Sequence, residues 1–171
     1  MAKVKANIYR ISGNTVYIDC FGIKGHLTGT ILIDKEDLEK VSVYKWHIEH
    51  SRKTIDYAQT SLPGKTLRLH RLIMQTDLQI DHINHNGLDN RKCNLRICTN
   101  QENNFNKNHN RNPKSGYTGI RYNEKANSYY VRILVNKKEI SLGHYKTLEE
   151  ALLARKNGEL TYFGEFTYKN S

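Results

Sequence analysis

Two adjacent residues, Asp81 and His82, place a carboxylate next to an imidazole at the end of a short apolar stretch. Phosphodiester hydrolysis needs an activated water, charge stabilisation on the phosphate and help for the departing oxygen. One imidazole with one hard divalent cation can supply all three. Because neighbouring side chains of a strand point to opposite faces, Asp81 can hold the cation while His82 faces the attacking water. Asn103 offers a neutral oxygen that can complete a magnesium site made of few protein ligands and several waters.

Two short strands and a helix are expected to position these residues. Residues 79–83 and 94–98 are predicted strands, and an Asn-Gly turn lies between them. The pattern Thr99-x-x-Glu102 predicts a capping box that opens a helix ending near residue 107. Such a unit buries little apolar surface, which is typical of a fold stabilised by a metal.

Four groups of residues in this segment match one family pattern. They are Asp81-His82, Leu88-Asp89-Asn90-Arg91, Asn94-Leu95 and Asn103-Asn104. Through them, residues 70–106 resemble the HNH subfamily of His-Me finger nucleases, which includes phage intron-encoded homing endonucleases. The resemblance implies a ββα-metal core that cleaves double-stranded DNA, with Mg²⁺ or Mn²⁺ as the cofactor.

The resemblance also implies a role for each matching residue. His82 corresponds to the general base, and Asp81 and Asn103 correspond to the metal ligands. Asn94 corresponds to the asparagine that braces the loop and orients the histidine. Asn90 is expected to help fix the same loop, and an ordinary turn asparagine is the alternative.

The resemblance begins at His70 and Arg71, which are expected either to contact a phosphate near the cut or to anchor a strand. A zinc site has to be weighed too, because histidines and cysteines lie close together in this segment. Structural zinc sites usually have cysteines two to four positions apart, and Cys93 and Cys98 do not form such a pair. The pattern therefore does not favour zinc.

Residues 113–171 are expected to form a second domain, which binds DNA. Strands are predicted near 118–122, 129–135 and 139–142, with turns at Asn136-Lys137 and Gly143-His144, followed by an amphipathic helix from Leu148. Segments 115–120, 129–133 and 142–145 resemble the Apetala-two-type DNA-binding domain. That resemblance implies that the sheet enters the major groove and the helix lies behind it.

Strand alternation assigns the two faces of this sheet. Val131 and Ile133, with Tyr129 and Val135, are expected to pack on the helix. The residues predicted to face DNA are Arg121, Asn123, Tyr130, Arg132 and Ser141. The basic linker before the sheet adds three predicted phosphate contacts, Lys107, Arg111 and Lys114.

The charge of the chain agrees with a polyanionic partner. The formal net charge is +10, and residues 91–138 hold eleven lysines and arginines against two acidic residues, so this stretch alone carries +9. The three cysteines form no close pair and are expected to be reduced thiols of a cytosolic protein. No apolar stretch approaches the ~20 residues of a membrane span.

Residues 1–66 are predicted to be β-rich. A hairpin is expected around Ser12-Gly13-Asn14, and a second one from 46–50 and 56–61, with Trp46 in the core. A short helix is predicted between them, with Asp34 as its cap. Neither composition nor pattern indicates a function for this region.

Together these patterns predict an α+β chain of three parts: a β-rich region 1–66, a nuclease core with a basic linker 67–112, and a DNA-binding domain 113–171. The expected function is sequence-preferring cleavage of double-stranded DNA by a homing-type endonuclease, in the cytoplasm of a bacterial or phage-infected cell. The alternative is a non-catalytic sequence-specific DNA-binding protein, and binding to structured RNA is a weaker one. Monomer and homodimer remain open.

Overall fold

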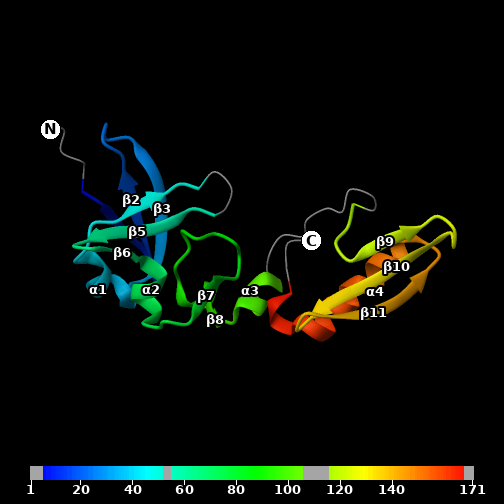
Figure 1. The fold of residues 1–171 in the computed structure, drawn as a ribbon. Coiled ribbons are helices and arrows are strands. Elements are labelled where there is room, and N and C mark those ends of the chain that lie inside the picture. The colour runs from blue at the N-terminus through cyan, green and yellow to red at the C-terminus, as the bar shows by residue number, and fades with distance from the viewer. Residues whose placement is uncertain (1–5, 52–54, 106–115, 168–171) are drawn as a thin grey trace. The chain divides into compact units, whose positions relative to one another are not determined.

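The computed structural model describes residues 6–51, 55–105 and 116–167. The chain divides into two compact units, Met1–Thr99 and Asn100–Ser171 (Figure 1). The described residues form several small antiparallel sheets with short helices beside them, so the predicted mixed α and β class is confirmed. No helix in the described part of the chain is long and apolar enough to cross a membrane.

The first unit begins with an antiparallel sheet of β1 (Ile8–Ser12), β2 (Thr15–Phe21) and β3 (Leu27–Asp34). The predicted β1–β2 hairpin is confirmed. Strand β3 was not predicted. Strict alternation in β2 buries Val16 and Ile18 completely, and every second residue in between faces away from the core.

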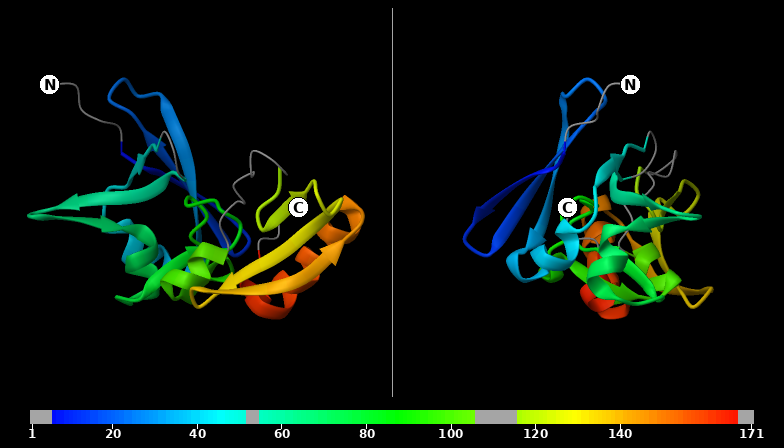
Figure 2. Two further views of the ribbon diagram at one scale, coloured as in Figure 1. Left: turned by 45° about the vertical axis from the view of Figure 1, so that its right-hand side comes forward. Right: turned by 90° about the vertical axis from the view of Figure 1, so that its left-hand side faces the viewer.

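A second sheet follows, made of β4 (His47–Glu49), β5 (Tyr57–Leu62) and β6 (Lys65–Arg68). The expected pairing of β4 with β5 is confirmed, and β6 extends the sheet. The β5–β6 hairpin projects from the body of this unit in both views of Figure 2. Trp46 is 1% exposed, as predicted, and its indole Nε1 donates to the carbonyl of Val41 at 2.9 Å.

The predicted helix before β4 is short. A 3-10 turn, η1 (Lys35–Asp37), leads into α1 (Leu38–Ser42). Asp34 occupies the predicted N-cap position, but its side chain makes no capping hydrogen bond. The carboxylate instead accepts from the backbone N–H of Lys92 at 2.7 Å.

Helix α2 (Leu69–Met74) leads from the second sheet to the predicted nuclease segment. Residues 70 and 71 are therefore helical, and the guanidinium of Arg71 donates to the carbonyl of Leu78, directly before the predicted strand 79–83. The two predicted strands are confirmed as an antiparallel pair, β7 (Gln79–His82) and β8 (Leu95–Cys98), and η2 (Lys92–Asn94) precedes β8. Apolar residues of both sheets, α2, β7 and β8 form one buried core.

The second unit contains α3 (Asn100–Phe105), a three-stranded sheet, α4 (Leu148–Phe163) and η3 (Gly164–Phe166). The sheet has the order β11-β10-β9, with β9 (Ile120–Asn123), β10 (Ser128–Val135) and β11 (Lys138–Tyr145). Helix α4 packs on it and starts with a capping box between Thr147 and Glu150. The expected sheet with one packed helix is thus present.

The predicted assignment of Val131 and Ile133 to the buried face of this sheet is also confirmed. Val131 and Ile133 are at most 1% exposed, and Val131 packs with Ala151 of α4, whereas Leu134 is 59% exposed. Asn136 and the next residue both have positive φ, which confirms the turn between β10 and β11. The second predicted turn is wrong, because Gly143 lies inside β11, next to an irregularity in its register with β10.

Candidate active site

Strand β7 presents Asp81 and His82 on opposite faces of the β7–β8 hairpin. Asp81 pairs across the hairpin with Arg96, and His82 pairs with Leu95. The His82 ring lies in a cluster of rings. Its centroid is 5.2 Å from the ring of His70 on α2 and 5.8 Å from a tyrosine ring of β5. The arrangement separates the carboxylate from the imidazole, as the hydrolytic scheme requires.

A hydrogen bond to Asn90 fixes the tautomer of His82. Nε2 of the ring lies 3.4 Å from Oδ1 of Asn90, and the amide nitrogen of Asn90 donates to the carbonyl of Gly87 at 3.3 Å. Because an amide oxygen can only accept, Nε2 must carry the proton, and Nδ1 holds the lone pair. The basic nitrogen of this imidazole is therefore Nδ1.

Burial keeps both histidines of the cluster neutral near neutral pH. Desolvation lowers the pKa of His82, against the opposing effects of the Asn90 hydrogen bond and of nearby carboxylates. Burial lowers the pKa of His70 to about 3, and repulsion by two arginines, and by His82 in its charged form, adds to the shift. Within the described chain, the buried Nδ1 of His70 has no hydrogen-bond partner. A neutral imidazole is the form that can accept a proton from water.

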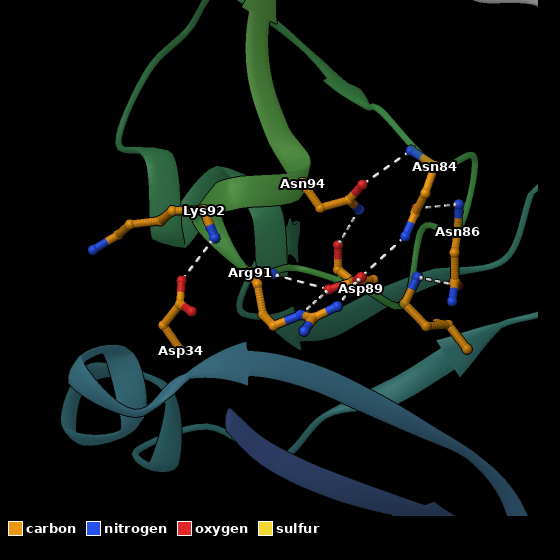
Figure 3. A network of polar contacts seen from close by, with 8 residues as sticks. Asp34, Asn84, Asn86, Asp89, Arg91, Lys92 and Asn94 are labelled. Carbon is orange, nitrogen blue, oxygen red and sulfur yellow. Dashed lines mark hydrogen bonds and ion pairs between the residues drawn. The ribbon is translucent and has the colours of Figure 1, made fainter. Parts of the chain in front are cut away.

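The loop between β7 and β8 is held by its own polar side chains (Figure 3). The amide nitrogen of Asn94 donates to the carbonyl of Asp89 at 2.7 Å, and the backbone N–H of Asn84 donates to Oδ1 of Asn94 at 2.9 Å. The guanidinium of Arg91 donates to both carboxylate oxygens of Asp89 at 2.8 and 2.7 Å. Asn94 thus braces the loop, while the direct contact with His82 comes from Asn90.

The N-terminal sheet supports this loop from outside. The backbone N–H of Leu32 in β3 donates to the carbonyl of Leu88 at 2.9 Å, and the N–H of Asn90 donates to the carbonyl of Leu32 at 2.8 Å. The hydrogen bond from the backbone N–H of Lys92 to the carboxylate of Asp34 is a third contact between this sheet and the loop (Figure 3). The region for which the sequence indicated no role therefore positions the loop that holds His82. The two bonds of Leu32 use backbone groups alone, so no residue type could have revealed them.

The carboxylate of Asp81 is engaged by Arg96, a residue that sequence reasoning missed. Nε and a terminal nitrogen of the guanidinium donate to Oδ2 at 2.9 and 2.7 Å, and the two side chains are 8% and 11% exposed. The cross-strand register would have revealed this pair, because Arg96 lies opposite Asp81. In the described part of the chain, no three His, Cys, Asp or Glu residues gather as a metal cluster.

Comparison with known proteins adds an independent observation. A protein of Acanthamoeba polyphaga mimivirus, named as an uncharacterized HNH endonuclease, is 30% identical over 168 residues, which cover 94% of this chain and 83% of that protein. The chain belongs to the HNH endonuclease family. No family model matches the chain, and no solved structure matches it.

The remaining predicted site residues of this HNH family member have different surroundings. Arg71 uses its guanidinium to hold the turn after α2, donating to the carbonyl of Thr76 at 2.9 Å and to that of Leu78. Asn103 lies on α3, in the second unit. The three predicted linker contacts, Lys107, Arg111 and Lys114, lie outside the described residues.

On the second unit of this HNH family member, three of the predicted contacts line one open hollow of about 810 Å³. They are Arg121, Asn123 and Tyr130. The same hollow includes His144, whose ring centroid is 4.9 Å from that of Tyr130 across the sheet. The sequence did not single out this histidine. Arg132 is engaged by Glu139 of the neighbouring strand, and Ser141 is the exposed cross-strand partner of Arg132.

Proposed function

We propose that this chain is a metal-dependent endonuclease that hydrolyses phosphodiester bonds of double-stranded DNA. The observation that carries the proposal is the placement of His82. Its neutral ring has a fixed tautomer and lies next to Asp81, which points to the other face of the same strand. Membership of the HNH endonuclease family agrees with this chemistry.

In the proposed reaction, Nδ1 of His82 takes a proton from the attacking water. The proton on Nε2 stays hydrogen-bonded to the amide oxygen of Asn90, so the ring keeps its orientation while it becomes charged. His82 is 2% exposed, so the proposed step requires neighbouring side chains to give water access to Nδ1. Asn94 acts on this step through the loop, since it holds the segment that carries Asn90.

Asp81 is the proposed ligand of a divalent cation, and Asn103 is the second ligand that the family resemblance implies. A carboxylate and an amide oxygen are hard donors, and a site with so few protein ligands suits Mg²⁺ or Mn²⁺ with several waters and a phosphate. When bound, the cation supplies charge stabilisation for the phosphate and for the departing 3′ oxygen. Until then, the guanidinium of Arg96 neutralises the Asp81 carboxylate.

The second unit is the proposed source of sequence preference. Its exposed sheet face carries Arg121 and Tyr130, and an arginine on such a face can bind O6 and N7 of a guanine in the major groove. We assign this sheet and α4 to an Apetala-two-type DNA-binding module. Homing of an intron or another mobile element, which the family resemblance implies, is the proposed biological role. One active site per chain makes nicking the expected product of a monomer.

Plasmid cleavage tests the proposal directly. Supercoiled plasmid should become open-circular or linear with Mg²⁺, and should stay supercoiled with EDTA or with the His82→Ala variant. His26→Ala is the matched control, because His26 is exposed and lies outside the ring cluster. Cleavage that survives in His82→Ala would contradict the assignment of the base. Binding of several DNAs without cleavage under any metal would favour the non-catalytic DNA-binding protein.

A further inference from the structure

We infer that the outward face of the β4–β5–β6 sheet, centred on Arg68, binds the phosphate backbone of the duplex next to the cleaved bond. The inference rests on the proposed function, because it takes the same DNA as its ligand. Arg68 ends β6 immediately before α2, and neither the charge pattern nor the resemblance singled it out.

The first observation is the position of Arg68 beside the ring cluster. Its Cζ lies 4.6 Å from the centre of the Tyr57 ring, and that ring lies 5.8 Å from His82. The guanidinium is therefore no more than about 10 Å from the proposed base. Phosphates of one DNA strand follow each other at an axial rise of roughly 3.4 Å, so a phosphate at Arg68 would lie within a few nucleotides of the cleaved bond.

The second observation is that the sheet face around Arg68 is polar and hollowed. Ala58 and Thr60 of β5 are buried, so the alternate residues of β5 face outward, and Gln59 pairs with Arg68 of β6. An open hollow of about 440 Å³ lies on this face. Its lining residues are Glu49, Gln59, Thr66, Leu67, Arg68 and Arg71. A duplex backbone fits such a surface better than an apolar partner does.

The third observation is that the Arg68 guanidinium is available. Its side chain is 46% exposed, and within the described residues it forms a single ion pair, with Glu49, whose distance of 3.7 Å is long and whose groups are solvent-exposed. Arg71, the other arginine of the hollow, is committed to backbone carbonyls. A phosphate can bind the guanidinium of Arg68 through two parallel hydrogen bonds, which the loose contact with Glu49 does not provide.

The same chain offers a matched control. Arg10 of β1 also lies over a tyrosine, with its Cζ 5.5 Å from the Tyr17 ring, and it also has a carboxylate partner, Asp19. The guanidinium of Arg10 donates two hydrogen bonds, of 3.0 and 2.9 Å, to the carboxylate of Asp19. Arg10 does not adjoin the histidine pair. It therefore has the same charge and stacking as Arg68 without the proposed ligand.

The test measures the salt dependence of DNA binding in EDTA, so that cleavage plays no part. Fluorescence anisotropy of a short labelled duplex of mixed sequence gives the Kd at a series of NaCl concentrations. Arg68→Ala should weaken binding severalfold and reduce the slope of log K against log [NaCl] by about 0.9, the amount lost with one phosphate contact. Arg10→Ala should keep the wild-type slope. Glu49→Gln, which removes the competing carboxylate, should tighten binding.

The possible results separate this inference from the proposed function. An unchanged slope in Arg68→Ala, or an equal loss in Arg10→Ala, would overturn the inference even if the wild type cleaves plasmid. A reduced slope confined to Arg68→Ala would support it even if no cleavage occurs. Should Arg68→Ala fail to fold, Glu49→Gln decides: tighter binding supports the phosphate contact, and unchanged or weaker binding contradicts it.

Discussion

Arg96 donates two hydrogen bonds to a single carboxylate oxygen of Asp81, across the hairpin that also carries His82. The guanidinium supplies the positive charge that a divalent cation would otherwise supply to the same carboxylate. A cation that binds Asp81 therefore competes with Arg96 or shares the carboxylate with it. This relationship makes the proposed metal site testable without any cleavage assay.

Arg96→Met should make folding more dependent on metal. Removing the guanidinium from this largely buried pair should lower the free energy of unfolding by about 3 kcal/mol in EDTA. Mg²⁺ should then restore part of that stability and raise the Tm of the variant more than that of the wild type. Differential scanning fluorimetry with and without Mg²⁺ measures both effects.

Arg91→Met provides the control for this experiment. It breaks the comparable ion pair with Asp89, whose side chain is 4% exposed but is not a proposed ligand. This variant should lose stability without gaining a response to Mg²⁺. The same small Mg²⁺ effect in both variants would argue against Asp81 as a ligand.

Asn94 should affect cleavage through the loop that it braces. Asn94→Ala removes the acceptor of the Asn84 N–H and the donor to the Asp89 carbonyl, and should lower the free energy of unfolding by about 2 kcal/mol. The nicking rate should fall, while DNA affinity in EDTA should remain near the wild-type value. Asn94→Asp keeps the acceptor but loses the donor, so its stability and nicking rate should lie between those of the wild type and those of Asn94→Ala. If affinity falls as much as the nicking rate does, Asn94 has no selective role in catalysis.

His70 should make the protein less stable in acid. Its folded pKa of about 3 lies below the ordinary value of 6.5, so the unfolded chain binds the proton more readily. The stabilising contribution is complete above pH 6.5 and is lost as the pH falls towards 3, by about 1.4 kcal/mol for each pH unit. For His70→Phe, urea unfolding across this pH range should show a smaller loss of unfolding free energy with falling pH than the wild type shows. The loss that remains should be due in part to His82. An identical pH dependence in the two proteins would contradict this account.

The sequence predicted the local elements well, because their physical determinants are local. Alternation of apolar residues placed β10 and its buried face, and a short strand followed by a turn placed the β7–β8 hairpin around His82. The false turn at Gly143 came from a residue that also suits a strand irregularity, since both require unusual backbone angles.

Contacts between segments distant in the chain could not be predicted in this way. The tie between Leu32 and the loop uses backbone groups alone, and Asp34 has the pattern of a helix cap although its carboxylate binds Lys92. The pair of Asp81 and Arg96 depends on strand register, which a one-residue shift would abolish. The candidate base was therefore predictable from its motif, whereas its supports were not.

Glu139 should weaken the interaction of the C-terminal sheet with DNA. Its carboxylate pairs with the guanidinium of Arg132 and accepts a hydrogen bond from the hydroxyl of Tyr130 at 3.2 Å, so it engages two predicted DNA contacts. Glu139→Gln should tighten binding by about threefold, because the pair is exposed and worth little by itself. Glu149→Gln makes the same charge change on α4, behind the sheet, and should have a smaller effect. Equal effects of the two substitutions, measured by anisotropy at one salt concentration, would show that net charge alone governs affinity and that this face of the sheet does not contact DNA.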